Sequence, residues 1–381
     1  MLYIKNAKVV LETGIIWDGV IVLDKDRIAA LGKAKDLEIP KGAEVLDANG
    51  LYVGPGFVDI HVHGGNGYYF EKDPEDAAEF FLRNGTTTIV PTLYFDLSKQ
   101  GFLDAIETIR RAKENSKCGK IIEGLYMEGP YMNPKYGAMA DLNKWKGDIC
   151  PAQYEDVVDA ASDFVKVWAI APEREGIVPF LQYAKKNNPQ VVFSVGHSEA
   201  TPEQIAELKH YGIKLQTHCA NATGQTGGKG GIRGVGPDEY CFADHDMYAE
   251  VICDSLGIHV KPSMLRAILK IKGVDRTILI TDHCVSEDPV PEQYSHIEDL
   301  VFDHNGGLNG SKLTMSMACR NMMEHTNCGI TQTFLLAARN PARILGLEHE
   351  IGTIQVGKKA NLVFVDDMFH VQKVIFEGNI V

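Results

Sequence analysis

The sequence lacks three features that would place it quickly in a familiar class. Among its 381 residues are eight cysteines, but no two of them form a C-x-x-C pair. No run of 18 apolar residues occurs. Basic residues are not in excess, since the net charge is −13. Zinc knuckles use closely spaced cysteines, and a membrane span needs about 20 apolar residues. Nucleic acids and anionic membranes bind basic surfaces. We therefore favour buried thiols over a disulfide or zinc framework, and expect neither nucleic acid nor membrane as a partner.

The amino-terminal segment MLYIKNAKVV also lacks the charged region, apolar core and small-residue cleavage site of a secretory leader. A cytoplasmic location is the resulting expectation. The composition, 45% hydrophobic and 23% charged, is that of a globular protein. The length suits a large α/β barrel with an appended domain.

Between residues 56 and 283, apolar β-branched segments alternate with helical patterns such as PEDAAEFFLRNG and KPSMLRAILKIKG. There are eight such segments, at 56–63, 86–93, 121–129, 164–173, 191–198, 213–219, 248–255 and 276–283. Eight strands alternating with helices predict a (β/α)8 barrel of the TIM type. The alternative is an open, doubly wound sheet.

Both ends of the chain are rich in short strand patterns, for example GIIWDGVIVLD and NLVFVDD. Neither end is long enough to bury a core alone. We therefore predict a small β-sandwich domain built from residues 1–53 and 354–381, with the barrel at 54–353. Met315, Cys319, Met322 and Met323 recur at helical spacing after the eighth strand, which is typical of a core helix.

The stretch FVDIHVHGG places His61 and His63 one residue apart at the end of the first barrel strand. Residues i and i+2 of a strand share a face, so both imidazoles can reach one ion. The same spacing also occurs in strands without a metal, so this pair alone leaves the question open.

Four further polar residues stand at the ends of predicted strands: Glu128, His197, His218 and Asp282. Active sites of (β/α)8 barrels lie at the carboxyl ends of the strands. Imidazole and carboxylate donors suit an open catalytic site for Zn²⁺, Fe²⁺, Mn²⁺ or Co²⁺. Six donors exceed the needs of one tetrahedral ion and would serve two ions bridged by a carboxylate. We predict a site for one or two divalent ions, with zinc the first candidate.

The segments FVDIHVHG, LYMEGPYMNP, VGHSEAT, THCANA, LITD, GLNGSKLTMSMACRNM and NPARILGL occur in this order. Together they resemble the amidohydrolase superfamily and, within it, the N-acetylglucosamine-6-phosphate deacetylase family. The resemblance covers nearly the whole chain, and the MEGP, GHS and TH-x-x-NA elements are its most specific parts. It implies a metal-dependent deacetylase of a phosphorylated N-acetyl amino sugar, and a homodimer or higher homo-oligomer.

The resemblance also implies roles for the six residues. His61, His63 and Asp282 would hold one ion, His197 and His218 a second, and Glu128 would bind one or both. A bound ion acidifies water and polarises the amide carbonyl. Asp282 is the candidate catalytic base and acid, because a carboxylate beside the ion can take a proton from water and return it to the leaving nitrogen.

Substrate-binding residues follow the family less closely. Asn221 and Ala222 match its phosphate contacts, and His259 resembles its sugar-phosphate histidine, although two extra residues separate it from Asp254. Met139 stands where the family usually has a histidine, and a thioether is a poor hydrogen-bond donor.

The family's phosphate-binding arginine, often supplied by a neighbouring subunit, has no direct counterpart in GQTGGKGGIRGVGPDEY. Lys229 and Arg233 are the available cations there, either as phosphate ligands or as solvated loop charges. Two further functions therefore stay open: hydrolysis of another N-acyl amino sugar or small amide, and a metal-binding scaffold without catalysis.

Overall fold

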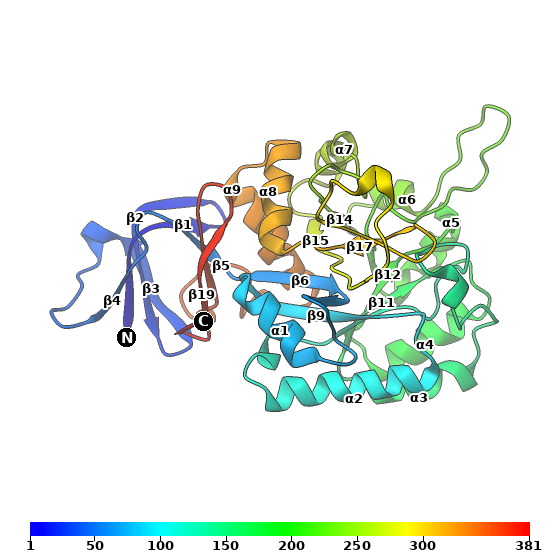
Figure 1. Cartoon of the computed structure of the whole chain (residues 1–381), viewed down its shortest axis with the longest axis horizontal. Helices are drawn as coiled ribbons and strands as arrows, with labels where there is room; N and C mark the ends of the chain where they lie inside the picture. The colour runs from blue at the N-terminus through cyan, green and yellow to red at the C-terminus, as the bar shows by residue number, and fades with distance from the viewer.

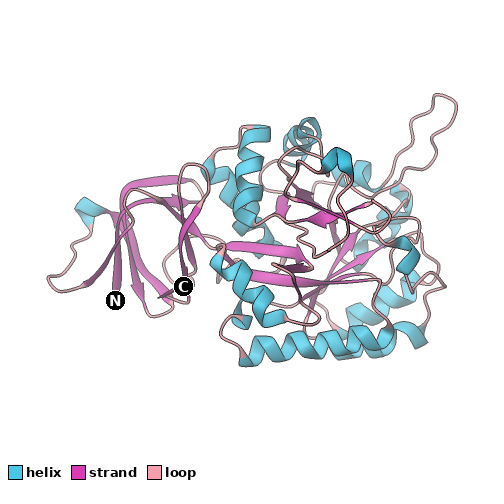
Figure 2. Ribbon diagram, viewed as in Figure 1, coloured by secondary structure: helices cyan, strands magenta, loops and turns pink.

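The computed structural model describes all residues from 1 to 381, which form a barrel and a smaller strand-rich part beside it (Figures 1 and 2). Eight parallel strands follow one another around the barrel in chain order. They are β6 (Phe57–Val62), β9 (Thr86–Tyr94), β10 (Leu125–Glu128), β11 (Val165–Ile170), β12 (Val192–Val195), β13 (Ile213–Gln216), β14 (Tyr248–Ile252) and β15 (Thr277–Ile280). This order confirms the (β/α)8 prediction and excludes the doubly wound sheet, in which the strand order reverses.

The first and eighth strands meet through backbone hydrogen bonds at their carboxyl ends. The amide of Asp282 donates to the carbonyl of His61 at 3.0 Å, and the amide of His63 donates to the carbonyl of His283 at 2.9 Å. These bonds close the barrel at its carboxyl edge. The segments that carry the His-x-His pair and Asp282 are therefore neighbours in space.

Helices cover the outside of the barrel (Figure 2). Many begin with a proline or after a capping hydroxyl, as where Thr201 accepts a hydrogen bond from the amide of Gln204. Their bounds are α1 (Pro74–Arg83), α2 (Lys99–Asn115), α3 (Pro151–Ala161), α4 (Ile177–Asn187), α5 (Pro202–Leu208), α6 (Pro237–Ala243), α7 (Pro262–Lys272), α8 (Met315–Thr326), α9 (Ile330–Phe334) and α10 (Asn340–Ile344), with a π-helical turn at Leu335–Arg339. Short 3₁₀ turns lie at Ala34–Asp36, Gly119–Ile121, Ala140–Leu142, Lys209–Tyr211 and Glu292–Tyr294.

The strand-rich part combines both ends of the chain in one hydrogen-bonded sheet of eight strands. The strands are β1 (Leu2–Leu11), β2 (Gly14–Asp24), β3 (Arg27–Lys33), β4 (Glu44–Asp47), β5 (Tyr52–Pro55), β18 (Leu362–Val365), β19 (Val371–Phe376) and β20 (Asn379–Ile380). Antiparallel pairing of β5 with β18 joins the two ends. The sheet packs around a core of 13 buried residues, separate from the barrel core of 82. The boundaries proposed for the two domains stay a prediction.

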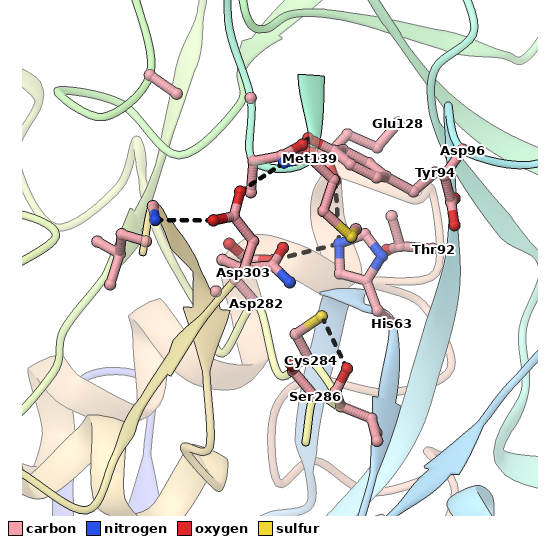
Figure 3. A pocket seen from close by; sticks show the side chains of 18 of the residues that line it. His63, Thr92, Tyr94, Asp96, Glu128, Met139, Asp282, Cys284, Ser286 and Asp303 are labelled. Atoms are coloured by element: carbon pink, nitrogen blue, oxygen red, sulfur yellow. Dashed lines mark hydrogen bonds and ion pairs between the residues drawn. The ribbon is translucent and has the colours of Figure 1, made fainter. Parts of the chain in front are cut away.

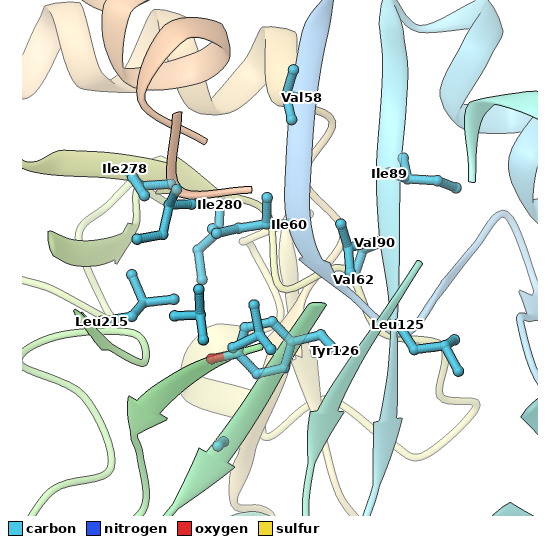
Figure 4. Close-up of a cluster of buried hydrophobic side chains, with 14 of the residues drawn as sticks. Val58, Ile60, Val62, Ile89, Val90, Leu125, Tyr126, Leu215, Ile278 and Ile280 are labelled. Carbon is cyan, nitrogen blue, oxygen red and sulfur yellow. The ribbon is translucent and has the colours of Figure 1, made fainter. Parts of the chain in front are cut away.

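Part of the large core lies inside the barrel, where apolar side chains from several strands pack together (Figure 4). Interior packing of this density makes the strands a stiff frame for the residues that follow them. Met315, Cys319 and Met322 of α8 are fully buried, as their spacing indicated, and Met323 is partly buried.

All eight cysteines are free thiols, and six of them are buried. Burial raises the pKa of the Cys219 thiol well above its ordinary value, and it raises that of Cys284 as well. Both thiols are therefore poor nucleophiles at neutral pH. None of the helices combines the length and apolar character needed to cross a bilayer.

Residues of the NPARILGL segment tie the carboxyl-terminal helices to the barrel. The Asn340 side-chain amide donates to the carbonyls of Val274 and Thr277 at 2.7 and 2.6 Å, and its oxygen accepts from Arg339. Asn340 is fully buried. Arg339, which directly precedes this segment, also pairs with Glu12 of the strand-rich part at 2.8 Å. The segment thus links β15 with both parts of the molecule.

Replacing Asn340 with alanine should lower the free energy of unfolding by about 2–3 kcal/mol, because one buried and one partly buried carbonyl lose their donor. Urea denaturation followed by circular dichroism measures the change. Asn379→Ala is the control: its amide donates only to the carbonyl of Glu377 at an exposed site, so it should shift stability by less than about 0.5 kcal/mol. Equal effects of the two substitutions would contradict this role.

Candidate metal centre

The six polar residues singled out in the sequence gather at the carboxyl edge of the barrel. His61 lies in β6 and His63 directly follows it, and Glu128 is the last residue of β10. The other three each stand two residues after a strand: His197 after β12, His218 after β13 and Asp282 after β15. Five are buried, and His63 is partly buried with 13% of its side chain exposed. Parallel strands bring their carboxyl ends to one side, which is why residues more than 200 positions apart meet here.

Three of these residues have left-handed backbone conformations. The φ angles are 46° at His197, 25° at His218 and 48° at Asp282. Such φ values cost a non-glycine residue about 1–3 kcal/mol and persist only where the surroundings enforce them. Strain after three strands at the same edge of the barrel is typical of a functional site.

Glu128 lies between two groups of side chains and faces each with a different oxygen. Its Oε2 is 3.1 Å from His61 Nε2 and 3.0 Å from His63 Nε2. Its Oε1 is 2.7 Å from His197 Nε2 and 3.0 Å from His218 Nε2. Asp282 joins the first group, with Oδ1 3.3 Å from His63 Nε2 and 3.6 Å from His61 Nε2.

These separations fit metal coordination. A tetrahedral ion with ligand bonds of about 2.0–2.1 Å holds its donor atoms about 3.3 Å apart. In the second group the two imidazole Nε2 atoms of His197 and His218 face each other at 3.0 Å. Two groups of donors can therefore each hold one cation: His61, His63, Glu128 and Asp282, and Glu128, His197 and His218.

The electrostatics of the cluster also attract positive charge. Burial opposes a charge on His63, but hydrogen bonds to Asp282 and Glu128 outweigh it and raise the pKa of His63 to about 9. Burial likewise opposes ionisation of Asp282, yet hydrogen bonding to His63 and the nearby His61 hold the pKa of Asp282 below its usual range. Asp282 therefore stays a carboxylate at neutral pH and can accept a proton.

The segment GLNGSKLT holds Asp282 in place. The amide of Ser311 donates to the Asp282 carbonyl at 2.8 Å. Gly310 has a φ of 74°, and a Cβ there would lie 2.5 Å from the same carbonyl oxygen. The close approach explains a glycine at this position.

A cavity of about 510 Å³ opens onto the cluster, large enough for a sugar phosphate. The cavity wall includes the hairpin of β16 (Leu300–Phe302) and β17 (Leu308–Ser311). The cavity also lies near the short hairpin of β7 (Gly64–Gly65) and β8 (Tyr68–Tyr69). His63, Glu128, His197, His218 and Asp282 all line it.

Met139 lines the cavity, with its side chain directed inwards (Figure 3). Its backbone has a φ of 53°, and its amide donates to Asp303 Oδ2 at 2.7 Å. A second contact joins the same loops, because Asp141 pairs with His304 at 3.0 Å. The Met139 loop is thus attached to the β16–β17 hairpin.

Asn221, Ala222 and His259 also line the cavity. The Asn221 carbonyl lies 3.2 Å from His218 Nδ1, so this residue also orients a member of the cluster. The Nδ1 atom of His259 is 3.1 Å from Asp254 Oδ2, and its buried Nε2 has no partner within the chain. Asp254 also accepts from the amides of Ile258 and His259, which accounts for the longer spacing between Asp254 and His259.

Lys229 and Arg233 do not reach the cavity of their own chain. Both are exposed, on a β-hairpin that pairs Thr226 with Val235 and extends away from the barrel (Figure 1). Arg233 contacts Glu239 at 3.5 Å.

Sequence reasoning missed several residues of the cavity wall. The wall carries four carboxylates outside the metal cluster but a single lysine and no arginine; these residues are Glu71, Asp96, Asp288, Asp303 and Lys72. They lie in loops without a distinctive pattern, and only the fold brings them together. Burial raises the pKa of Glu71 and of Asp96.

The barrel and its cluster of imidazoles and carboxylates define a protein of the metal-dependent hydrolase type. The Amidohydrolase family model matches residues 52–381, and the chain belongs to this family. The prediction of an amidohydrolase is thus confirmed.

Similar proteins include deacetylases that match over nine-tenths or more of their length. An N-acetylglucosamine-6-phosphate deacetylase of Vibrio furnissii is 27% identical over 379 residues, covering 96% of this chain and 92% of that protein. An N-acetylgalactosamine-6-phosphate deacetylase of Escherichia coli O157:H7 is 27% identical, covering 90% of each chain. The crystal structure of N-acetylglucosamine-6-phosphate deacetylase from Pasteurella multocida superposes with a TM-score of 0.87 at 26% identity, covering 100% of this chain and 99% of that one.

Removing divalent metal with a chelator should abolish activity and lower the melting temperature, because metal bound only by the native state stabilises it. An ion at about 100 times its dissociation constant adds about 2.7 kcal/mol. Differential scanning calorimetry with and without added Zn²⁺ measures the shift. His197→Asn should reduce the shift in melting temperature caused by Zn²⁺. His304→Asn, at the exposed pair with Asp141, should leave that shift unchanged. Identical melting with and without metal would contradict the site.

Proposed function

We propose that the chain hydrolyses the N-acetyl amide of a hexosamine 6-phosphate, with N-acetylglucosamine 6-phosphate as the first candidate, to give the amino sugar phosphate and acetate. One observation carries the proposal: Glu128 lies between two groups of candidate metal donors, and Asp282 lies beside it on the cavity wall. Similarity to deacetylases of two N-acetylhexosamine 6-phosphates, over at least 90% of each chain, supports the substrate class. A structure of the Mycobacterium smegmatis deacetylase in complex with N-acetylglucosamine 6-phosphate, with a TM-score of 0.81 and 26% identity, supports it further.

The proposed cofactor is two divalent ions, with zinc first and iron, manganese and cobalt as alternatives. His61, His63 and Asp282 would hold one, His197 and His218 the other, and Glu128 would bridge them. A bound ion of this kind supplies Lewis acidity and lowers the pKa of water. The donor set of nitrogen and oxygen atoms supports this assignment without selecting among these metals.

Asp282 carries the proposed proton transfer. Its carboxylate accepts a proton as water attacks the amide carbon, and it returns that proton to the nitrogen as the C–N bond breaks. Its depressed pKa keeps the carboxylate ionised at neutral pH, so that both oxygens are free of a proton when water binds. The amide of Asp282 donates to the carbonyl of His61, and its carbonyl accepts from the amide of Ser311. These two backbone bonds keep the side chain in position for both steps.

Three features support a phosphate at the far end of the substrate. The amide of Ala222, which has a φ of 51°, has no partner within the chain, and Asn221 adjoins it on the cavity wall. Free backbone amides in such turns bind anions. The unpartnered Nε2 of His259 lies on the same wall.

A homodimer is the proposed assembly, and Lys229 or Arg233 would then reach the cavity of the partner subunit. The support is their position on an exposed hairpin, where Ile232 is 70% exposed. A cation on this hairpin would offset the acidic cavity wall. The cytoplasmic location stays a prediction.

A second candidate substrate is an unphosphorylated N-acyl amino sugar. The observation in its favour is the cavity wall, where four carboxylates and Met139 accompany a single lysine. Carboxylates repel phosphate unless their charge is compensated. Asp303 is partly compensated, since it accepts hydrogen bonds from the amides of Met139, Asn305 and Gly307.

Acetate release from a panel of phosphorylated and free N-acetylhexosamines tests the function. We expect turnover of a 6-phosphate, measured with a coupled acetate assay on protein of known metal content. Turnover of the free sugars alone would favour the second candidate. If the protein with full metal occupancy released no acetate from any substrate, both candidate substrates would be overturned and a metal-binding scaffold would remain.

Asp282→Asn should lower kcat by at least about 100-fold, because general acid–base catalysis contributes about 10²–10⁴-fold. The asparagine keeps the size of the side chain, so circular dichroism should match the parent protein. Asp288→Asn, which changes a carboxylate of the same cavity outside the cluster, is the matched control and should retain most of the activity. Near-normal turnover in Asp282→Asn would remove this residue from the mechanism.

A further inference from the structure

Glu250 is a buried carboxylate in the barrel interior to which the sequence patterns assigned no role. It lies in the middle of β14, a strand that contributes nothing to the metal cluster, and it is fully buried. Its Oε2 lies 3.4 Å from His61 Nδ1. The only ion pair that Glu250 makes is this one with His61.

The same oxygen contacts two other strands. It accepts from the amide of His218 at 3.3 Å and lies 3.5 Å from the hydroxyl of Tyr126. The Tyr126 ring lies 4.5 Å from the His61 ring, and its hydroxyl is 2.8 Å from Thr217 Oγ1. Glu250 thus contacts a residue of each proposed metal group, one through its ring and one through its backbone.

The contact with His61 selects one form of the imidazole. A neutral imidazole has one N–H and one lone pair, and a carboxylate can only accept a hydrogen bond. With the proton on Nδ1 and donated to Glu250, Nε2 keeps its lone pair for a cation held between it and the carboxylate oxygens of Glu128 and Asp282. That is the form in which His61 can bind a metal ion.

His61 differs in this respect from the other three histidines. His218 Nδ1 faces the neutral carbonyl of Asn221, and His197 Nδ1 is buried without a partner. The carboxylate contacts of His63 are made through Nε2. Only His61 has carboxylates facing both ring nitrogens.

We infer that Glu250 is a positioning residue that fixes the tautomer of His61 and thereby sets the metal affinity of the His61, His63, Glu128 and Asp282 group. Carboxylates behind a ligating histidine typically contribute 10–100-fold to metal affinity. The inference rests on the metal centre proposed above but not on the identity of the sugar. The second group depends less on Glu250, because His218 meets it only through the backbone amide.

Metal titration of the apoprotein against a chromophoric chelator, with metal content by mass spectrometry, tests the inference. Glu250→Gln keeps the shape and removes the charge, and should weaken Zn²⁺ at the His61 group about 10–100-fold while the Glu128, His197 and His218 group keeps its ion. The matched control is Asp59→Asn. Asp59 is also fully buried and accepts from the backbone amides of His61 and Thr281 and from the Thr281 hydroxyl, but it does not contact the imidazole. It should leave both affinities unchanged.

A measurement on the parent protein keeps the test valid if Glu250→Gln fails to fold. Long-range ¹H–¹⁵N spectra of the zinc-loaded protein, assigned with His61→Asn, should place the His61 proton on Nδ1. A proton on Nε2, or equal zinc affinity in the parent and Glu250→Gln, would overturn the inference. So would a parent protein that binds no ion at the His61 group. Failure of the parent to release acetate from any sugar, with these affinities as expected, would overturn the proposed substrate alone.

Discussion

Glu128 presents one carboxylate oxygen to each of two histidine pairs, and the rest of the site depends on this division. If only one oxygen of Glu128 faced the histidines, there would be a single group of donors. The other pair of imidazoles would then face each other with no negative charge between them. The division requires strands β6, β10, β12 and β13 to end at one edge of the barrel, within reach of a single side chain. Parallel closure of the barrel meets that requirement, and the backbone bonds between the segments after β6 and β15 bring Asp282 to the same place.

The metal centre and the substrate cavity are built from the same short segments. Asn221 borders the cavity and also contacts His218. Asp282 belongs to the first metal group and also lines the cavity. A substrate that moves either segment would therefore also move a metal donor. Under the proposed function, this coupling would place the binding of the acyl group, the supply of a proton and the retention of metal under one set of backbone constraints.

The sequence predicted the barrel and the proximity of its six polar residues because each of these depends on a short, local pattern. An apolar β-branched segment predicts a buried strand, and a histidine or carboxylate directly after it predicts a side chain at the carboxyl edge. Glu250 escaped this reasoning because it stands inside a strand, in YAEVICDS, where a lone carboxylate has no periodic signal. The acidic wall escaped it as well, since Glu71, Asp96 and Asp288 come from separate loops without a shared motif.

The sequence by itself determined the class of fold, the donor atoms available for metal and the loops in which this chain departs from its relatives. Those properties follow from side-chain chemistry and from spacing along the chain. Only the tertiary structure decided that Glu128 faces two groups, that Lys229 and Arg233 lie outside their own cavity, and that Glu250 lies behind His61. These are distances between residues far apart in the chain, and they arise only when barrel closure fixes the position of every strand at once.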